Sequence, residues 1–368
     1  MPSVPALLPR GVRAAAAISP RFGGDIAYRL FFTTSPRMTV RTADAPTHGD
    51  ARRGRLRVRG VEVVTYEWGT GPRTVLLLHG WRGRASQFAP LVRELVAEGF
   101  RVVAFDAPAH GASGGRRTDI RDWVDAAEQL QERHGPFAAI IGHSFGALAA
   151  ATAARSTVPT RAVAAIAGAA SPDAFLAEFA RELHLDARTA TRLAVRFRRR
   201  LDVDEATVSA RYDAARHPLP DSTALLVVHD RDDRRMPDDD SLRLHRAHGE
   251  RSRLLRTDGL GHTRVLSADA VLDAVVALVG NGLDGVDALR TTEDPLRTTE
   301  GPMRTTEAED LGEPGQRERR RTRGRTAAAV TAPAATSTAA TKPPVTRTAA
   351  MVPNTAMPSP PPSAKPTS

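Results

Sequence analysis

A serine between two glycines stands near the middle of this sequence, in the pentapeptide Gly142-His143-Ser144-Phe145-Gly146. The apolar run 138–141 precedes it, as expected for a buried strand, and the alanine-rich segment 147–154 follows it with the composition of a helix. A tight turn from strand to helix crowds the neighbouring side chains, and glycines relieve that crowding. The pattern predicts that the Ser144 hydroxyl stands exposed at the sheet edge, near a helix N-terminus, as a nucleophile.

The candidate base for this nucleophile is His262. A serine hydroxyl is a poor nucleophile at neutral pH, so it needs a base to take its proton and a third group to orient that base. His262 ends the segment Gly259-Leu260-Gly261-His262, which follows a predicted last strand over residues 253–257 and precedes a predicted helix over residues 268–279. We expect His262 on a loop at the carboxyl end of that strand.

The orienting acid is expected after the apolar run 225–229, because it should lie between the serine and the histidine along the chain. Three carboxylates occur there: Asp230, Asp232 and Asp233. Asp173, after the preceding predicted strand, is a further candidate. Position alone leaves the choice among them open.

Negative charge that develops on a substrate carbonyl oxygen requires two backbone N–H donors. The residue after the nucleophile, Phe145, supplies one of them. Trp81 supplies the other, from the loop His79-Gly80-Trp81 after the predicted strand 75–78. His79 is an alternative second base, but we interpret it as a residue that shapes this loop.

The elements that must position these residues alternate regularly along the chain. Short apolar runs without polar alternation occur at residues 75–78, 102–105, 139–141, 163–166 and 225–228. Such runs are typical of parallel strands covered by helices on both faces, and helical patterns lie between them. Residues 56–67 alternate instead, as an exposed antiparallel hairpin does. The sequence therefore predicts an α/β fold with a doubly wound, mostly parallel sheet.

Taken together, the motifs resemble the α/β-hydrolase superfamily over residues 55–279. The segments that carry the resemblance are His79-Gly80-Trp81, Phe105-Asp106-Ala107-Pro108-Ala109-His110-Gly111-Ala112-Ser113, Gly142-His143-Ser144-Phe145-Gly146, Asp233-Arg234-Arg235-Met236-Pro237 and Gly261-His262. Family members often carry an aspartate, two residues, an apolar residue and proline at the acid loop, which favours Asp233 over Asp232. The stretch at Asp106 is similar to a structural turn of the family.

The resemblance is nearest to the serine esterase and lysophospholipase-like branch with a small helical cap. The serine at the elbow argues against the haloalkane dehalogenase and epoxide hydrolase branches, which use aspartate there. A helical stretch without a strand, about residues 171–223, is the predicted cap. Its phenylalanines suggest either an apolar acyl pocket or simple packing of the cap. Four of its arginines either meet an anionic head group or form a solvated helix face: Arg196, Arg198, Arg199 and Arg200.

The domain organisation that we predict has three parts: an N-terminal arm at residues 1–54, an α/β-hydrolase domain at 55–283 and a disordered tail at 284–368. In the arm, residues 26–32 suggest a short helix that ends before Pro36, and residues 42–53 suggest a loop. In the tail, Arg-Thr-Thr-Glu recurs from Arg290, and the remainder is basic or rich in Ala, Thr and Pro. Such a composition cannot bury enough apolar area to offset its ordering entropy.

Composition narrows the class of protein further. The absence of cysteine excludes disulfides, thiolate metal sites and a cysteine nucleophile. Prolines interrupt the N-terminus, so it does not have the pattern of a signal peptide, and no apolar run has the length of a membrane span. We expect a soluble, cytoplasmic protein. The net charge of +10 comes from scattered arginines, interpreted as a solvated surface.

These observations predict a serine hydrolase that cleaves a carboxylic ester or thioester of a small molecule through an acyl-enzyme, without a metal or organic cofactor. Acyl transfer to another acceptor, or peptidase or lactonase chemistry on the same triad, stays open. The alternative of another class is a catalytically silent scaffold whose basic run 317–325 binds an acidic partner or nucleic acid. That run has no interleaved aromatic residues for base stacking, which argues against nucleic acid. The oligomeric state is not indicated.

Overall fold

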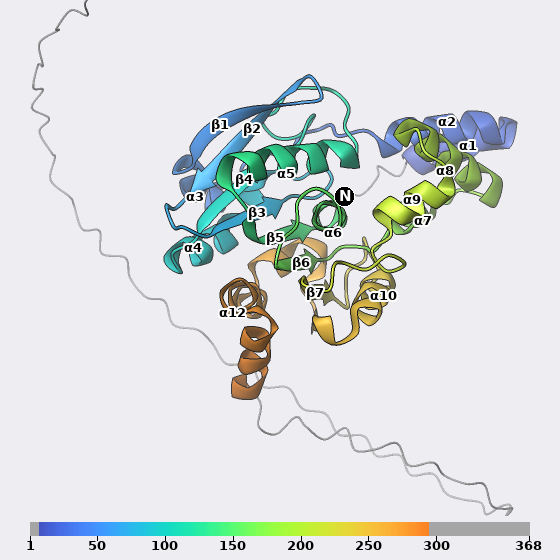
Figure 1. Cartoon of the computed structure of the whole chain (residues 1–368). Helices are drawn as coiled ribbons and strands as arrows, with labels where there is room; N and C mark the ends of the chain where they lie inside the picture. The colour runs from blue at the N-terminus through green and yellow to red at the C-terminus, as the bar shows by residue number, and fades with distance from the viewer. Residues whose placement is uncertain (1–6, 294–368) are drawn as a thin grey trace, which may run out of the picture. The chain divides into compact units, whose positions relative to one another are not determined.

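Eight strands form one mixed sheet in the order β1-β2-β4-β3-β5-β6-β7-β8 in the computed structural model, which describes residues 7–293 (Figure 1). From β4 to β8 all neighbours are parallel, whereas β2 pairs antiparallel with β1 and with β4. This confirms the predicted doubly wound, mostly parallel sheet. The strands are β1 (Arg52–Val58), β2 (Val61–Trp68), β3 (Thr74–Leu78), β4 (Arg101–Phe105), β5 (Phe137–His143), β6 (Ala162–Ile166), β7 (Ala224–Asp230) and β8 (Ser252–Thr257).

The burial of the strands explains their sequence patterns. Every residue of β3 and β6 is buried, because helices cover both faces of the sheet there. The outer hairpin of β1 and β2 has mixed burial, which matches its polar alternation. Its turn places Arg59 and Gly60 at positive φ, 45° and 84°, as a two-residue hairpin turn requires.

Two sets of helices cover the two faces of the sheet and bury separate apolar clusters (Figure 1). One face packs against α5, α6 and α10, and the other packs against α4 and α12. The α6 helix is buried along its whole length, which only a helix made almost entirely of small apolar residues tolerates. The bounds are α4 (Ala89–Ala97), α5 (Ile120–His134), α6 (Phe145–Ala154), α10 (Asp239–His248) and α12 (Asp269–Glu293), with short turns η2 (Ala85–Phe88), η3 (Gly249–Arg251), α11 (Gly261–Arg264) and η4 (Val265–Ser267).

Three helices occupy the segment between β6 and β7 in which the sequence showed helical periodicity and no strand. They are α7 (Pro172–Glu182), α8 (Ala187–Leu201) and α9 (Glu205–Tyr212). Asp186 and Asp204 cap α8 and α9 by accepting N–H bonds from Thr189 and Thr207. Each helix buries the apolar side of its surface, whereas arginines of α8 range from exposed, as Arg199 is, to largely buried, as Arg200 is.

The N-terminal residues form more helix than the sequence indicated. The helices α1 (Leu7–Ile18) and α2 (Pro20–Phe31) pack together, and α2 lies against α8 (Figure 1). Ser19 caps α2 by accepting a bond from the Arg21 N–H, and Pro20 occupies the first turn, so the helix starts well before residue 26. Residues 42–53, expected to be a loop, contain η1 (Thr42–Asp44) and α3 (Ala45–Gly49), which Trp68 holds through a bond to the Thr47 carbonyl.

The last described helix also runs further than expected. A break at Gly282, with φ of 67°, bends α12, and the chain then continues as helix to Glu293. Val286 is buried and Asp287 forms an ion pair with Arg253 on β8, so this part has contacts that composition did not indicate. The rest of the segment predicted to be disordered, residues 294–368, lies outside the described residues.

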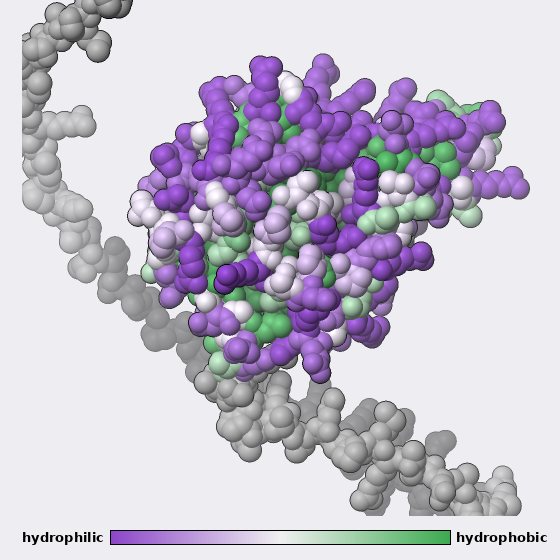
Figure 2. Space-filling view, in the orientation of Figure 1, coloured by the Kyte–Doolittle hydropathy of each residue, from purple (hydrophilic) through white to green (hydrophobic). Residues whose placement is uncertain are grey.

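Hydrophilic side chains cover most of the face shown in Figure 2. Within residues 7–293, no single helix has the length and apolarity of a membrane span; only the bent pair Gly261–Ser267 and Asp269–Leu289 passes that test when its two parts are taken together.

Candidate active site

Ser144 lies in the turn from β5 to α6, as the sequence predicted, but it is buried rather than exposed, with 8% of its surface accessible at the wall of a pocket. Its backbone is strained for a residue with a side chain, at φ 55° and ψ −119°, and its N–H donates to the Ile166 carbonyl of β6 at 2.8 Å. A Cβ at Gly142 would collide with the Gly146 carbonyl, and a Cβ at Gly146 would collide with the Leu78 carbonyl. Only glycine therefore fits on either side of the serine in this turn.

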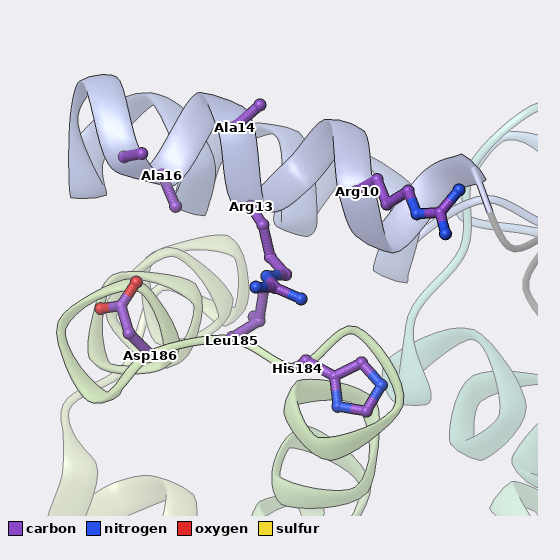
Figure 3. A pocket seen from close by; sticks show the side chains of 8 residues that line it. Arg10, Arg13, Ala14, Ala16, His184, Leu185 and Asp186 are labelled. Carbon is purple, nitrogen blue, oxygen red and sulfur yellow. The ribbon is translucent and has the colours of Figure 1, made fainter.

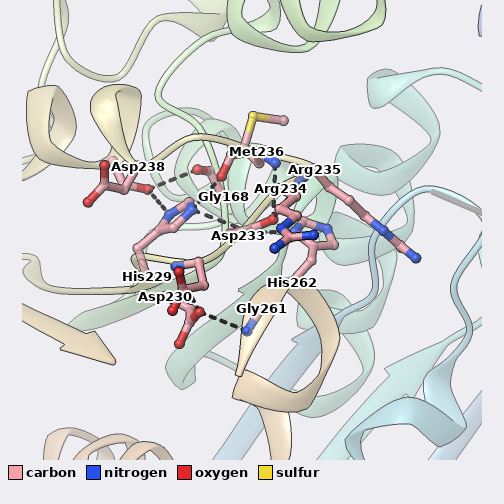
Figure 4. A network of polar contacts seen from close by, with 12 residues as sticks. Gly168, His229, Asp230, Asp233, Arg234, Arg235, Met236, Asp238, Gly261 and His262 are labelled. Carbon is pink, nitrogen blue, oxygen red and sulfur yellow. Dashed lines mark hydrogen bonds and ion pairs between the residues drawn. The ribbon is translucent and has the colours of Figure 1, made fainter. Parts of the chain in front are cut away.

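His262 lies on α11, a helical turn of four residues, rather than on the extended loop that the sequence suggested. A buried carboxylate holds this turn in place. Asp230 at the end of β7 accepts bonds from the backbone N–H groups of Leu260 at 3.1 Å and Gly261 at 2.8 Å, and from the Thr257 hydroxyl at 2.7 Å (Figure 4). The start of α11 is thus tied to the neighbouring strand.

Of the competing carboxylates, Asp233 is the one that meets the histidine. Its Oδ2 lies 2.7 Å from Nδ1 of His262, and its side chain is fully buried (Figure 4). Its Oδ1 accepts from the backbone N–H groups of Arg235 and Met236, which fixes the carboxylate. The other members of the loop have different contacts: Asp230 braces α11, and Asp232 accepts from the Gly259 N–H at 2.9 Å. Asp173 lies in the first turn of α7.

His229 is a site residue that the sequence reasoning missed. It is fully buried near the end of β7, and its Nε2 lies 2.8 Å from the Met236 carbonyl and 3.4 Å from Oδ2 of Asp233. Because a carbonyl only accepts, Nε2 carries the proton and donates it to the Met236 carbonyl, and this N–H also lies close to the Asp233 carboxylate. In the sequence His229 was only the last residue of an apolar run, and no motif distinguished it.

The protonation states that this geometry favours suit a base and its orienting acid. Burial opposes ionisation of Asp233, but the bonds from His229 and His262 outweigh it and hold the pKa of Asp233 well below its usual range. Burial lowers the pKa of His262, Asp233 partly offsets that effect, and the nearby charge of Arg235 adds to it. His262 is therefore neutral at pH 7, with Nδ1–H directed to Asp233 and Nε2 free to accept a proton.

His143, within the elbow motif, supports His262 from the other side. Its Nε2 lies 2.8 Å from the His262 carbonyl oxygen, and its Nδ1 lies 2.9 Å from the amide nitrogen of Gln87. Burial and the neighbouring His262 lower the pKa of His143 to about 3, so it is neutral, donating from Nε2 and accepting at Nδ1. In the sequence nothing near His143 predicted this role, because its partner His262 is far away along the chain.

The loop at Trp81 lies directly against Ser144. A Cβ at Gly80 would stand 2.9 Å from the Ser144 Cβ, so the loop approaches as closely as glycine permits. Within residues 7–293, no hydrogen bond occupies the N–H of Trp81 or of Phe145, the first residue of α6. His79 is fully buried, accepts from the Ala107 N–H at 2.9 Å and donates to the Gly80 carbonyl, which shapes this loop.

Ser144 and His262 both line one pocket of about 860 Å³. Phe175 and Phe179 of α7 and Met236 supply apolar walls, whereas Arg234 and Arg235 lie at the exposed side. Phe197 of α8 does not reach it; its ring stacks on Phe32, and the apolar hollow around it is only about 20 Å³. The phenylalanines of the predicted cap therefore divide between pocket lining and packing. In the described part of the chain, no group of three His, Asp or Glu residues is arranged to hold a metal ion.

The alpha/beta hydrolase family model matches residues 75–274. The monoacylglycerol lipase of Mycolicibacterium smegmatis is 33% identical over 100 residues, covering 24% of this chain and 36% of that protein, so the chain spans about a third of the length of this curated relative. The Pyrococcus furiosus esterase Pf2001 superposes with a TM-score of 0.50 at 19% identity, over 68% of this chain and 95% of that chain. A second crystal form of the same esterase gives a TM-score of 0.50 at 18% identity, over 69% and 97%. At these identities the structural likeness shows the fold alone.

Proposed function

Because the chain belongs to the alpha/beta hydrolase family, we propose that it is a serine hydrolase that cleaves a carboxylic ester or thioester through an acyl-enzyme intermediate. The observation that carries this proposal is the 2.7 Å bond between His262 Nδ1 and the buried Asp233, beside a strained serine that opens into the same pocket. A neutral, oriented imidazole that lines the same pocket as a serine is the arrangement that activates the serine hydroxyl. The relative named as a monoacylglycerol lipase supports an ester as the substrate.

In the proposed reaction, the Ser144 oxygen bonds to the substrate carbonyl carbon while His262 Nε2 accepts the hydroxyl proton. Asp233 keeps His262 in the required tautomer and stabilises the imidazolium that forms. The N–H groups of Trp81 and Phe145 donate to the carbonyl oxygen as it becomes negative. His262 then protonates the departing alcohol or thiol, and the bond from the carbonyl carbon to the leaving group breaks.

Water completes the cycle. It occupies the place of the leaving group, gives a proton to His262 and attacks the acyl carbon, and the second tetrahedral intermediate collapses to release the acid and restore Ser144. Phe175, Phe179 and Met236 offer the acyl chain an apolar wall beside the serine. This apolar wall supports a substrate with an apolar acyl group. The dependence of the hydrolysis rate on acyl chain length measures that preference.

The test is labelling by a fluorophosphonate probe, with the wild type beside Ser144→Ala and the control Ser222→Ala, an exposed serine far along the chain. We expect labelling of the wild type and of the control, and none of Ser144→Ala. Hydrolysis of p-nitrophenyl esters of rising chain length then ranks the acyl groups. Failure of the folded wild type to react, or equal labelling of Ser144→Ala, would contradict the proposal.

A further inference from the structure

A second large hollow lies beside the N-terminal helices, and Ser144 does not line it. It measures about 1140 Å³ and is bounded by α2 and the residues after it, by α8, and by the loop at residues 115–117. Six arginines line it: Arg29, Arg37, Arg116, Arg117, Arg196 and Arg200. Among the described residues that line it there is no aspartate or glutamate.

Only part of this positive charge is compensated. Asp25 lies 3.3 Å from Arg196, and Asp119 lies 3.4 Å from Arg200 and also serves other arginines. Within the described residues, the guanidinium groups of the exposed Arg29, Arg116 and Arg117 have neither an ion pair nor a hydrogen bond. Like charges gathered around one hollow repel one another, and an anion placed among them relieves that repulsion.

Two of the arginines are held in position by the protein itself. Arg37 donates to the carbonyls of the loop at residues 111–115, including Gly115 at 2.8 Å, so its charge faces no carboxylate. Arg200 lies over the Phe32 ring at 4.6 Å and donates to the Thr118 carbonyl at 3.1 Å, and its buried Nε lies 3.4 Å from Oδ2 of Asp119. Cations that are already ordered lose little side-chain entropy when a ligand binds.

We propose that this hollow is a binding site for a small phosphorylated anion carrying two or more negative charges, such as a diphosphate or a phosphate monoester. Guanidinium groups present forked N–H donors that match phosphate oxygens, and several of them converge here. The hydroxyls of Thr34 and Ser35 line the same hollow. Its volume accommodates the organic part of a phosphorylated molecule beside the phosphate groups.

Another hollow with arginines in its lining differs from the proposed site in its charge. About 630 Å³ in size, it lies between α1 and the turn from α7 to α8, lined by Arg10, Arg13, His184 and Asp186 (Figure 3). Here a carboxylate shares the lining with two arginines, so the positive charge is smaller. These arginines therefore provide a matched control for charge removal away from the proposed site.

The test compares two triple variants of the full chain that each remove three positive charges. Arg29→Gln/Arg116→Gln/Arg117→Gln changes the proposed site, and Arg10→Gln/Arg13→Gln/Arg199→Gln changes arginines outside it. Calorimetric titration with metal-free inorganic pyrophosphate should show binding to the wild type, about tenfold or more weakening in the first variant, and nearly unchanged affinity in the second. Equal weakening in both variants, or no binding by the wild type, would overturn the proposal.

Sedimentation with phosphatidylcholine vesicles, with and without phosphatidic acid, identifies the source of the phosphate. A lipid headgroup is supported as the ligand if the wild type binds the acidic vesicles, the first triple variant alone loses this binding, and pyrophosphate competes with it. Pyrophosphate binding without vesicle binding supports a soluble phosphorylated molecule. Vesicle binding that both triple variants lose alike would reflect net charge and would count against the site.

Discussion

Beside the pocket that contains Ser144, Asp233 and His262 are held by short, directional hydrogen bonds from β7, the acid loop and α11. On the aromatic side, the Phe31 ring lies 6.4 Å from the Trp81 ring and 6.0 Å from the Phe197 ring, centroid to centroid, and neither phenylalanine lines that pocket. Proton transfer needs heavy atoms within hydrogen-bond reach, whereas an apolar cluster needs only matching shape and volume. Isosteric substitutions among the hydrogen-bonded residues should therefore lower activity. Truncation of a ring on the aromatic side should instead lower stability.

The largest effect is expected from Asp233→Asn, which keeps the volume and removes the acceptor for His262 Nδ1–H. The imidazole then loses its required tautomer, and kcat should fall by roughly 10⁴-fold. Asp232→Asn is the matched control, since the Asp232 side chain accepts from the Gly259 N–H and not from His262, and its kcat should stay close to that of the wild type. Ester hydrolysis by both folded variants measures the difference. A comparable loss in Asp232→Asn would show that the wrong carboxylate has been assigned.

A smaller effect is expected from His143→Ala, because His143 is a positioning residue that acts through the His262 carbonyl. Loss of this bond should let His262 move and lower kcat by about 10²-fold, with little change in KM. His143→Gln keeps an amide donor and should restore part of the activity. Steady-state kinetics of both variants checks this, and a His143→Gln variant no better than His143→Ala would point to a packing role instead.

On the aromatic side, Phe197→Ala should lower the free energy of unfolding by about 3 kcal/mol or more, because it leaves a cavity among Phe31, Phe32 and α8. Its kcat should change much less than that of the two preceding variants, since Phe197 does not line the pocket that contains Ser144. Phe22→Ala, at a ring that is 52% exposed, is the control and should shift unfolding by less than about 0.5 kcal/mol. Urea titration measures the free energy of unfolding of both variants. Equal stability of the two would contradict a stabilising role for the aromatic side.

The smallest effect concerns pH. The reaction needs neutral His262, and burial holds the pKa of His262 below its ordinary value of 6.5, so kcat/KM should reach half its maximum below pH 6.5. Arg235→Gln removes a charge that lowers this pKa, so its acid limb should move to higher pH, while Arg234→Gln should leave the limb in place. The pH dependence of kcat/KM for the wild type and the two variants measures these shifts. A midpoint of the acid limb above pH 6.5 in the wild type would contradict the assignment of His262 as a buried base.

Much of the fold could be predicted because its signals are local. Uninterrupted apolar runs marked the parallel strands, and glycines marked the turn at Ser144, since each depends on residues close together in the sequence. The α1 and α2 helices and the end of α12 were harder to predict. They are stabilised by contacts with α8 and β8, which are far away along the chain, and no local pattern reports such contacts.

By itself, the sequence determined the parallel sheet, the sharp turn that carries Ser144, and the order of serine, acid and histidine along the chain. Only the tertiary structure decided which carboxylate meets His262, because Asp230, Asp232 and Asp233 have the same chemistry and differ only in direction. It also brought in His229 and His143, and it gathered six arginines around one hollow. These groupings depend on where side chains from distant segments point, and that is set by the packing of the whole sheet and its helices.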